Sequence, residues 1–190
     1  MKNFLVLFLV LFTIVLHAQK ENIDAKIIFK DGTEQNSKIK FRVNMFWSDL
    51  IDESSVAFKD VLVMDQNGKL IKTPSSLIQR IEFIDLKNKK RVFASRPEYK
   101  YLVEMLFEGK KLQWVRYYNI HSYDGSTQQT DYFHKPKMKT VALGVFSNNR
   151  KKLKELTGDR PDLIPLIEKI NFDKLKEEAL IEILQKYEEV

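Results

Sequence analysis

The sequence has no cysteine and little glycine or proline. Its 190 residues include 6 Gly and 5 Pro, and Cys is missing altogether. The lack of cysteine excludes disulfides, thiolate metal sites, cysteine nucleophiles and iron–sulfur clusters. The small Gly and Pro content excludes a collagen-like chain and a Pro/Gly-rich disordered one. The hydrophobic core alone must therefore hold the folded chain together.

Several catalytic signatures are also missing. The glycines stand singly, so the sequence has neither a Gly-rich phosphate loop nor a Gly-x-Ser-x-Gly elbow. Only 3 His occur, and they form no His-Glu-x-x-His motif. Hydride transfer and nucleotide hydrolysis have no support, and we expect no cofactor.

What the sequence does contain is typical of one globular domain. Apolar residues make up 44% of the chain and charged residues 31%, and the formal net charge is +6. The basic runs at residues 87–91 and 135–139 are of the kind found on ordinary solvated surfaces. We therefore expect no nucleic-acid partner.

The first eighteen residues have the layout of a secretory signal peptide. Lys2 precedes an apolar run of thirteen residues, 4–16, and Ala18 supplies a small residue after the run. A membrane-spanning helix needs about 20 apolar residues, so an uncleaved anchor is the less favoured alternative. We expect cleavage between Ala18 and Gln19, no transmembrane segment after cleavage, and a periplasmic or secreted protein. Without cysteine, the mature protein cannot be a lipid-anchored lipoprotein.

The body predicted over residues 19–146 is rich in short strands. Residues 26–30 and 38–43 flank an Asp-Gly turn, and residues 55–65 and 70–73 flank an Asn-Gly turn. Two further hairpins are expected, one from the strands 77–86 and 91–95 and one from the segments 99–107 and 112–120. The segment 99–107 also fits a helix, and weaker strand signals occur at residues 132–134 and 141–146.

The pattern changes to helices in the segment 147–190. Residues 150–156 and 161–170 are helix candidates, although Pro165 requires the second helix to start late or to bend. The stretch 173–189 places Leu180, Ile183, Leu184 and Tyr187 on one helical stripe. The predicted fold class is α+β: an antiparallel meander or open barrel followed by a small C-terminal helical unit packed on the same domain.

The order of these landmarks carries a resemblance. The sequence shows Lys30-Asp31-Gly32-Thr33, then PSSLIQRIEFID at 74–85, LFEGKKLQWVRYY at 106–118, DYFHK from Asp131, and the tail segments GDRPDLIPLIEKI and LQKYEEV. Together with the export signal, they resemble an uncharacterised family of exported proteins of Gram-negative bacteria. The resemblance implies export and a β-then-helix layout, and it supplies no activity, cofactor or site residue.

Two sets of side chains are candidates for enzymatic chemistry. His121, Asp124, Asp131 and His134 could hold a divalent metal if residues 120–121 paired with residues 132–134 across a hairpin. An ordinary hairpin loop is the favoured alternative. Glu98, Glu104 and Glu108 lie near an apolar strand and are candidate acids for glycoside hydrolysis, with surface charges as the better expectation.

Aromatic residues are the candidates for binding. Trp114, Arg116 and Tyr118 share one face of a predicted strand, while Val115 and Tyr117 share the other. An exposed platform for sugars, peptides or lipid chains would combine the first three residues with others of the loops, namely Tyr123, Tyr132, Phe46 and Trp47. In the favoured alternative, the final helix covers Trp114 or Tyr117.

Two functions follow from these patterns. The first is an exported, non-enzymatic binding or interaction module of the periplasm or cell envelope, with a protein, glycan or lipid as its partner. The alternative is a small hydrolase of envelope polymers that uses carboxylates or a His/Asp metal site.

Overall fold

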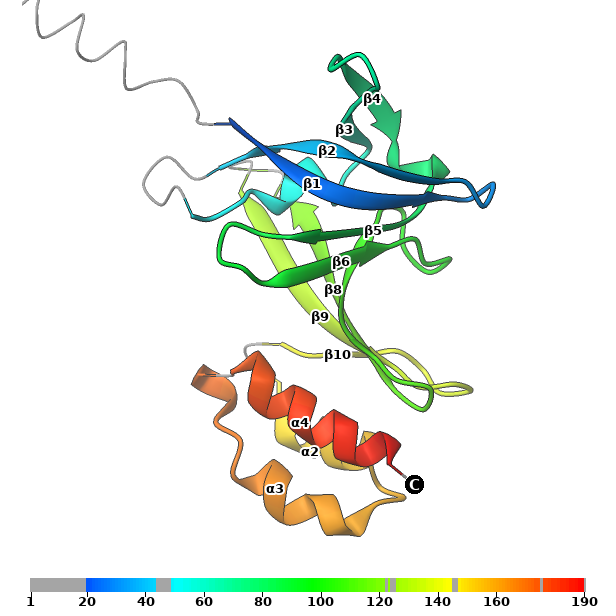
Figure 1. Ribbon diagram of the computed structural model, residues 1–190. Helices are drawn as coiled ribbons and strands as arrows, with labels where there is room; N and C mark the ends of the chain where they lie inside the picture. Colours follow the sequence, from blue (N-terminus) through cyan, green and yellow to red (C-terminus); the bar gives the residue numbers. More distant parts are fainter. Residues whose placement is uncertain are drawn as a thin grey trace, which may run out of the picture.

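A computed structural model (Figure 1) describes residues 20–43, 49–121, 123, 126–144, 147–174 and 176–189. The leader expected at residues 1–18 lies outside these ranges. Ten antiparallel strands form one sheet, and a helical unit follows them in the chain. The predicted α+β class is therefore confirmed.

The sheet is a meander with one exception. Its order is β10-β9-β8-β7-β6-β5-β1-β2-β3-β4, so β1 lies between β2 and β5. The strands are β1 (Lys20–Phe29), β2 (Glu34–Arg42), β3 (Asp60–Met64), β4 (Leu70–Pro74), β5 (Ile78–Ile84), β6 (Lys90–Ala94), β7 (Val103–Glu108), β8 (Gln113–Ile120), β9 (Thr127–His134) and β10 (Val141–Ala142). The ambiguous segment 99–107 thus ends in a strand.

Aspartates organise the tight turns of the predicted hairpins. The Oδ1 atom of Asp65 accepts hydrogen bonds from the backbone N–H groups two and four residues later, at 2.9 and 2.7 Å. Asp85 repeats this arrangement, at 2.9 Å for both bonds. The residue three positions after each aspartate has a positive φ, 77° at Gly68 and 59° at Asn88. Asn tolerates this left-handed conformation better than most residues, so it can take the place of glycine.

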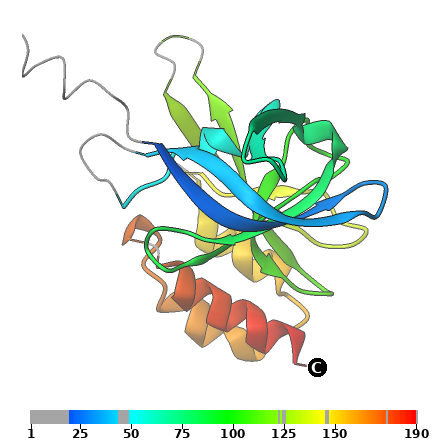
Figure 2. The same ribbon diagram turned by 45° about the horizontal axis from the view of Figure 1, so that its top comes forward.

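The sheet curls around a first hydrophobic core. Along β2, Ile39 and Phe41 point inward while Lys40 and Arg42 point outward, as the alternation predicts. Tyr118 of β8 belongs to the same buried cluster as residues of β1, β2 and β3, although five strands separate β8 from β3 in the sheet. Figure 2 shows β1 and β2 crossing over the rest of this curled body.

Three α-helices and two short 3₁₀ turns make up the helical unit. They are α2 (Asn149–Leu156), η3 (Pro161–Leu163), α3 (Ile164–Glu168), η4 (Phe172–Lys174) and α4 (Glu177–Glu188). Two more 3₁₀ turns, η1 (Glu53–Ser55) and η2 (Ser75–Leu77), belong to the sheet body. The predicted helix over residues 161–170 is divided into η3 and α3. Pro165 lies in the first turn of α3, where its missing N–H group costs little.

A second hydrophobic core joins the helical unit to the lower part of the β8–β9 hairpin. Trp114 of β8 and Phe133 of β9 share a buried cluster with Leu180, Ile183 and Leu184 of α4. The apolar stripe predicted for the final helix is buried as expected. Figure 1 shows this hairpin running from the curled body down to the helices, so it connects the two cores.

The turn between β7 and β8 encloses the side chain of Glu188, at the end of α4. Its carboxylate accepts hydrogen bonds from the backbone N–H groups of Lys110, Lys111 and Leu112, at 2.8 to 3.1 Å. A Cβ atom at Gly109 would collide with this carboxylate and lie 2.5 Å from the carbonyl oxygen of Leu112. Glycine at position 109 therefore makes room for the contact.

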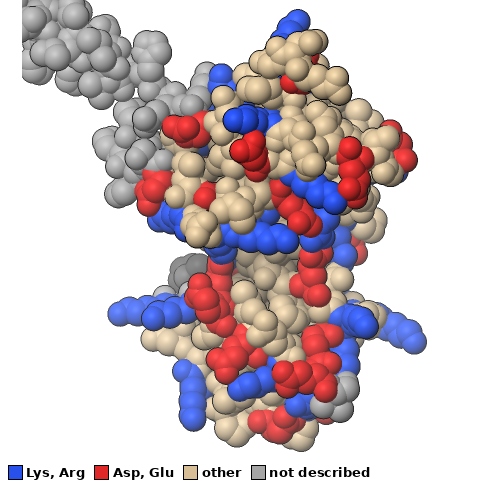
Figure 3. Space-filling view, viewed as in Figure 1, with Lys and Arg blue, Asp and Glu red and all other residues tan. Residues whose placement is uncertain are grey.

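The surface carries charges of both signs. Figure 3 shows Lys and Arg interspersed with Asp and Glu over the face in view. Among the helices of the described ranges, none is long and apolar enough to cross a bilayer.

Candidate functional site

The tryptophan, arginine, tyrosine, histidine and Asp131 candidates lie on the β8–β9 hairpin or at its tip, whereas the candidate acids Glu104 and Glu108 lie on β7. The antiparallel register runs from Gln113 opposite His134 to Ile120 opposite Thr127. Because side chains alternate between the faces of a strand, Trp114 and its neighbours at positions 116 and 118 face inward. Val115 and Tyr117 face outward.

Trp114 and Tyr118 are both buried. The exposed fraction of Trp114 is 0%, and its Nε1 atom donates a hydrogen bond to Asp131 at 3.2 Å. Tyr118 is 3% exposed and donates to Glu104 at 2.5 Å. The helical unit covers Trp114 and the curled sheet covers Tyr118. An exposed platform containing these two residues is therefore wrong, and the alternative in which the final helix covers Trp114 holds.

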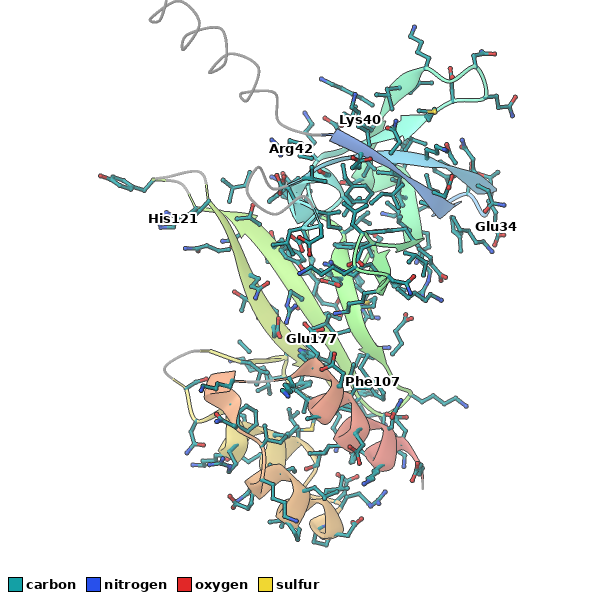
Figure 4. The ribbon with its side chains drawn as sticks, turned by 60° about the vertical axis from the view of Figure 1, so that its left-hand side comes forward. Glu34, Lys40, Arg42, Phe107, His121 and Glu177 are labelled. Atoms are coloured by element: carbon teal, nitrogen blue, oxygen red, sulfur yellow. The ribbon has the colours of Figure 1, made fainter. Side chains whose placement is uncertain are left out.

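Arg116 is occupied by ion pairs at the junction of the two cores. Its Nε and Nη2 atoms contact the two carboxylate oxygens of Asp131 at 2.7 and 3.0 Å. Its Nη1 atom contacts Glu177, at the start of α4, at 2.7 Å. Figure 4 shows Glu177 where the helical unit meets the sheet. Arg116 thus fixes α4 to the hairpin.

A second buried ion-pair group, the Arg91 network, consists of Arg91, Glu104, Tyr118, Glu53 and Asp85. Arg91 of β6 is 8% exposed and Glu104 of β7 is 2% exposed. The guanidinium binds both carboxylate oxygens of Glu104, with its Nη2 atom 2.9 Å from Oε2. Its remaining contacts are with Glu53 at 3.2 Å, Asp85 at 3.3 Å and Tyr118 at 3.3 Å. The charges on Arg91 and Glu104 are therefore paired within the fold.

The candidate acids for hydrolysis are all beside arginines. Glu104 belongs to the Arg91 network, Glu108 forms two hydrogen bonds of 2.6 Å with Arg80, and Glu98 lies 3.9 Å from Arg96. These contacts engage the three carboxylates in ion pairs within the fold and give them a structural role.

The register also separates the two histidines of the predicted metal site. His134 lies opposite Gln113, whereas the N–H of His121 bonds the carbonyl of Ser126 at the other end of the hairpin. At about 3.4 Å per residue the two histidines are roughly 25 Å apart. Figure 4 shows His121 at the end of the hairpin that points away from the helices. Asp131 is paired with Arg116, and Asp124 lies outside the described residues.

The register therefore does not bring together the two histidines of the candidate metal site. Within the described part of the chain, no three His, Cys, Asp or Glu side chains are grouped as metal ligands would be.

The outward face of the hairpin carries an aromatic cluster, here called the tyrosine face: Tyr99, Tyr117, Tyr132 and His134. The ring centroids of Tyr99 and Tyr117 are 5.3 Å apart, and those of Tyr99 and Tyr132 are 5.7 Å apart. The hydroxyl of Tyr99 lies 2.8 Å from Nε2 of His134. All four side chains are half-buried, and the three tyrosines rest on a small buried cluster consisting of Ala94, Val103, Met105 and Val115.

Neutral polar residues border the tyrosine face along β8 and β9, while Arg96 and Glu98 of the β6–β7 loop lie close enough to act on His134. The outward positions of β8 and β9 next to it hold Gln113, Asn119, Gln128 and Thr130. Neither strand places a Lys, Arg, Asp or Glu on this side. Tyr123 is 93% exposed in the loop beyond the strands. Phe46 and Trp47, the other residues of the expected platform, lie outside the described ranges.

Sequence reasoning found this face only in part. It singled out Tyr132 and His134 separately, and it placed Tyr117 opposite Trp114 on the strand. The correct register, in which Val115 pairs with Tyr132, would have shown that Tyr117 and Tyr132 lie on the same face of the hairpin. Tyr99 comes from the β6–β7 loop, where its N–H bonds the carbonyl of Arg96, and no periodicity indicates its position.

His134 makes the stability of the tyrosine face depend on pH. Burial lowers the pKa of His134 below its ordinary value of 6.5; Arg96 acts in the same direction and Glu98 against it. The unfolded chain therefore binds the proton at a higher pH than the folded chain does. The stability from neutral His134 is complete above pH 6.5 and is lost as the pH falls toward the folded-state pKa.

We expect wild type to lose more stability than His134→Gln between about pH 7.5 and pH 5.5, because glutamine has no proton to gain in that range. Urea unfolding at both pH values measures the difference. The two proteins have the same carboxylates, so the contributions of these groups to the pH dependence cancel in the comparison. Equal losses in the two proteins would contradict the assignment.

Comparison of this chain with protein-family models, curated proteins and solved structures gives no match.

Proposed function

We propose that this chain is an exported, non-enzymatic binding module of the cell envelope, and that the tyrosine face is its contact surface. The observation that carries the proposal is a stack of three half-buried tyrosines on the outward face of the β8–β9 hairpin. Tyrosine combines a large apolar ring with a polar end, so it suits contacts with ligands that are themselves amphipathic. The apolar run at residues 4–16 supports export.

The chemistry around the tyrosines favours a neutral glycan as the ligand. Amide and hydroxyl groups border the rings, and the outward side of β8 and β9 has no charged residue. A nucleic acid would require a basic surface, and an alkyl chain would require a more continuous apolar one. Sugar rings present apolar faces with hydroxyl edges, which match tyrosine rings bordered by amides.

Binding of soluble, uncharged glycan strands, such as chains of N-acetylglucosamine, tests the proposal. We expect Tyr117→Ala and Tyr132→Ala each to weaken binding by about 3- to 10-fold, because an aromatic contact contributes about 0.5–1.5 kcal/mol. Titration calorimetry measures the affinity. Circular dichroism confirms that each variant is folded.

Tyr123→Ala is the matched control, because it removes an exposed tyrosine from the same hairpin. Its affinity should equal that of wild type. The proposal fails if wild type does not bind the strands, if both tyrosine variants bind them as wild type does, or if the strands are cleaved.

A further inference from the structure

A groove in the helical unit lies between α3, η4 and α4. Its volume is about 410 Å³, which falls in the range of small-molecule sites, about 300–1,000 Å³. Leu166, Ile170, Ala179 and Ile183 supply apolar side chains to its lining. It belongs to other elements than the tyrosine face and is independent of the function proposed above.

Small and buried side chains give the groove an apolar floor. Ile170 and Ile183 are 7% and 5% exposed, so they form its base. Ala179 is exposed on the first turns of α4 and leaves space that a larger side chain would fill. An occupant with an apolar part could bury it here.

Lysines surround the same groove. Lys169, Lys174 and Lys176 are exposed, and none of them forms an ion pair with a described residue. The single carboxylate in the lining, that of Glu182, is 2.9 Å from Nζ of Lys186 and is thus already paired. Most other surface lysines near α2 and α3 have a partner, as Lys154 does with Glu168. Three exposed lysines thus lie beside one groove.

An apolar floor beside exposed cations complements one kind of molecule. We propose that the groove binds an anionic amphiphile with a single alkyl chain. The chain would lie on Ile170, Ala179 and Ile183, and the anionic head would contact the lysines. A neutral amphiphile would lack the ionic contact, and a cationic one would be repelled.

Titration calorimetry with dodecyl phosphate, dodecanoate, dodecyl maltoside and dodecyl trimethylammonium, each below its micellar concentration, tests the proposal. We expect the two anions to bind at least about tenfold more tightly than the other two amphiphiles. Phosphate and carboxylate heads are compared directly, so their affinities also show which head the lysines prefer.

Two variants locate the site. Ala179→Phe should weaken binding of both anions by about tenfold or more, because the ring occupies the space of the alkyl chain. Lys174→Glu/Lys176→Glu should remove the preference for anions. The matched control, Lys30→Glu/Lys59→Glu, makes the same change of net charge at exposed lysines of the sheet body and should bind as wild type does.

The result that would overturn the proposal is an absence of binding, equal affinity for all four amphiphiles, or unchanged affinity in Ala179→Phe. Tyr132→Ala should bind the anions normally, and Ala179→Phe should bind glycan strands as wild type does. Failure of this groove and failure of the tyrosine face are thereby separated.

Discussion

Replacing Arg91 by alanine is expected to lower the free energy of unfolding by about 3–5 kcal/mol. The substitution leaves Glu104, which is 2% exposed, as a buried carboxylate without its cation. Tyr118 remains as a hydrogen-bond donor to that carboxylate, but one hydroxyl cannot replace a guanidinium that binds both oxygens. Denaturant unfolding followed by far-UV circular dichroism measures the loss.

A partly exposed arginine provides the control for this prediction. Arg80→Ala also removes a guanidinium that binds carboxylates, those of Glu82 and Glu108, but these side chains are more exposed than the Arg91–Glu104 pair, with Arg80 at 25%, Glu82 at 27% and Glu108 at 41%. Such surface pairs contribute about 0–1 kcal/mol. Arg91→Met/Glu104→Gln should recover most of the stability lost in Arg91→Ala. No unpaired charge remains at position 104, and the glutamine side chain still accepts a hydrogen bond from the hydroxyl of Tyr118. Equal losses in Arg91→Ala and Arg80→Ala would contradict the role of the Arg91 network.

Trp114→Ala is expected to destabilise the protein by about 3–5 kcal/mol as well. Trp114 is among the largest fully buried side chains of the described residues, and its cluster contains residues of β8, β9, α2 and α4. Truncation leaves a cavity between the hairpin and the helices and removes the donor to Asp131. The free energy of unfolding in denaturant gives the effect.

Tyr123→Ala again serves for comparison, since its 93% exposed ring predicts a change within about 0.5 kcal/mol. Trp114→Phe should retain more stability than Trp114→Ala because it fills part of the cavity. A loss below about 1 kcal/mol in Trp114→Ala would mean that the helices do not depend on this contact.

Local sequence signals were sufficient for most of the elements. Asp-Gly and Asn-Gly turns located the first hairpins, and the stripe of Leu180, Ile183, Leu184 and Tyr187 predicted α4. β9 was predicted only at residues 132–134, yet it begins at Thr127. Its first residues, Thr-Gln-Gln-Thr-Asp, show no apolar alternation. Backbone pairing with β8 holds them in the sheet, and a single-strand pattern does not reveal that pairing.

Predicting the candidate sites required the strand register and the tertiary position of the helices, and neither can be derived from local sequence patterns. Placing residues 120–121 opposite 132–134 brought the histidines together, whereas the true register separates them. Trp114 and Tyr117 both read as aromatic strand residues, and only the position of α4 decides which of them is covered. Nothing in the sequence distinguishes Lys169, Lys174 and Lys176 from other surface lysines. Only the fold of η4 and α4 places them beside Ile170 and Ile183.

The contact between Glu188 and the β7–β8 turn has a consequence for the order of folding. The N–H of Leu112 and its acceptor on Glu188 are separated by 76 residues in the chain. During synthesis, the turn and the tryptophan beside it exist well before the helix that covers them. Closing so long a loop is slow compared with forming the local hairpins. A nascent chain would thus expose Trp114 until α4 arrives, and this interval is when a chaperone would be most useful to it.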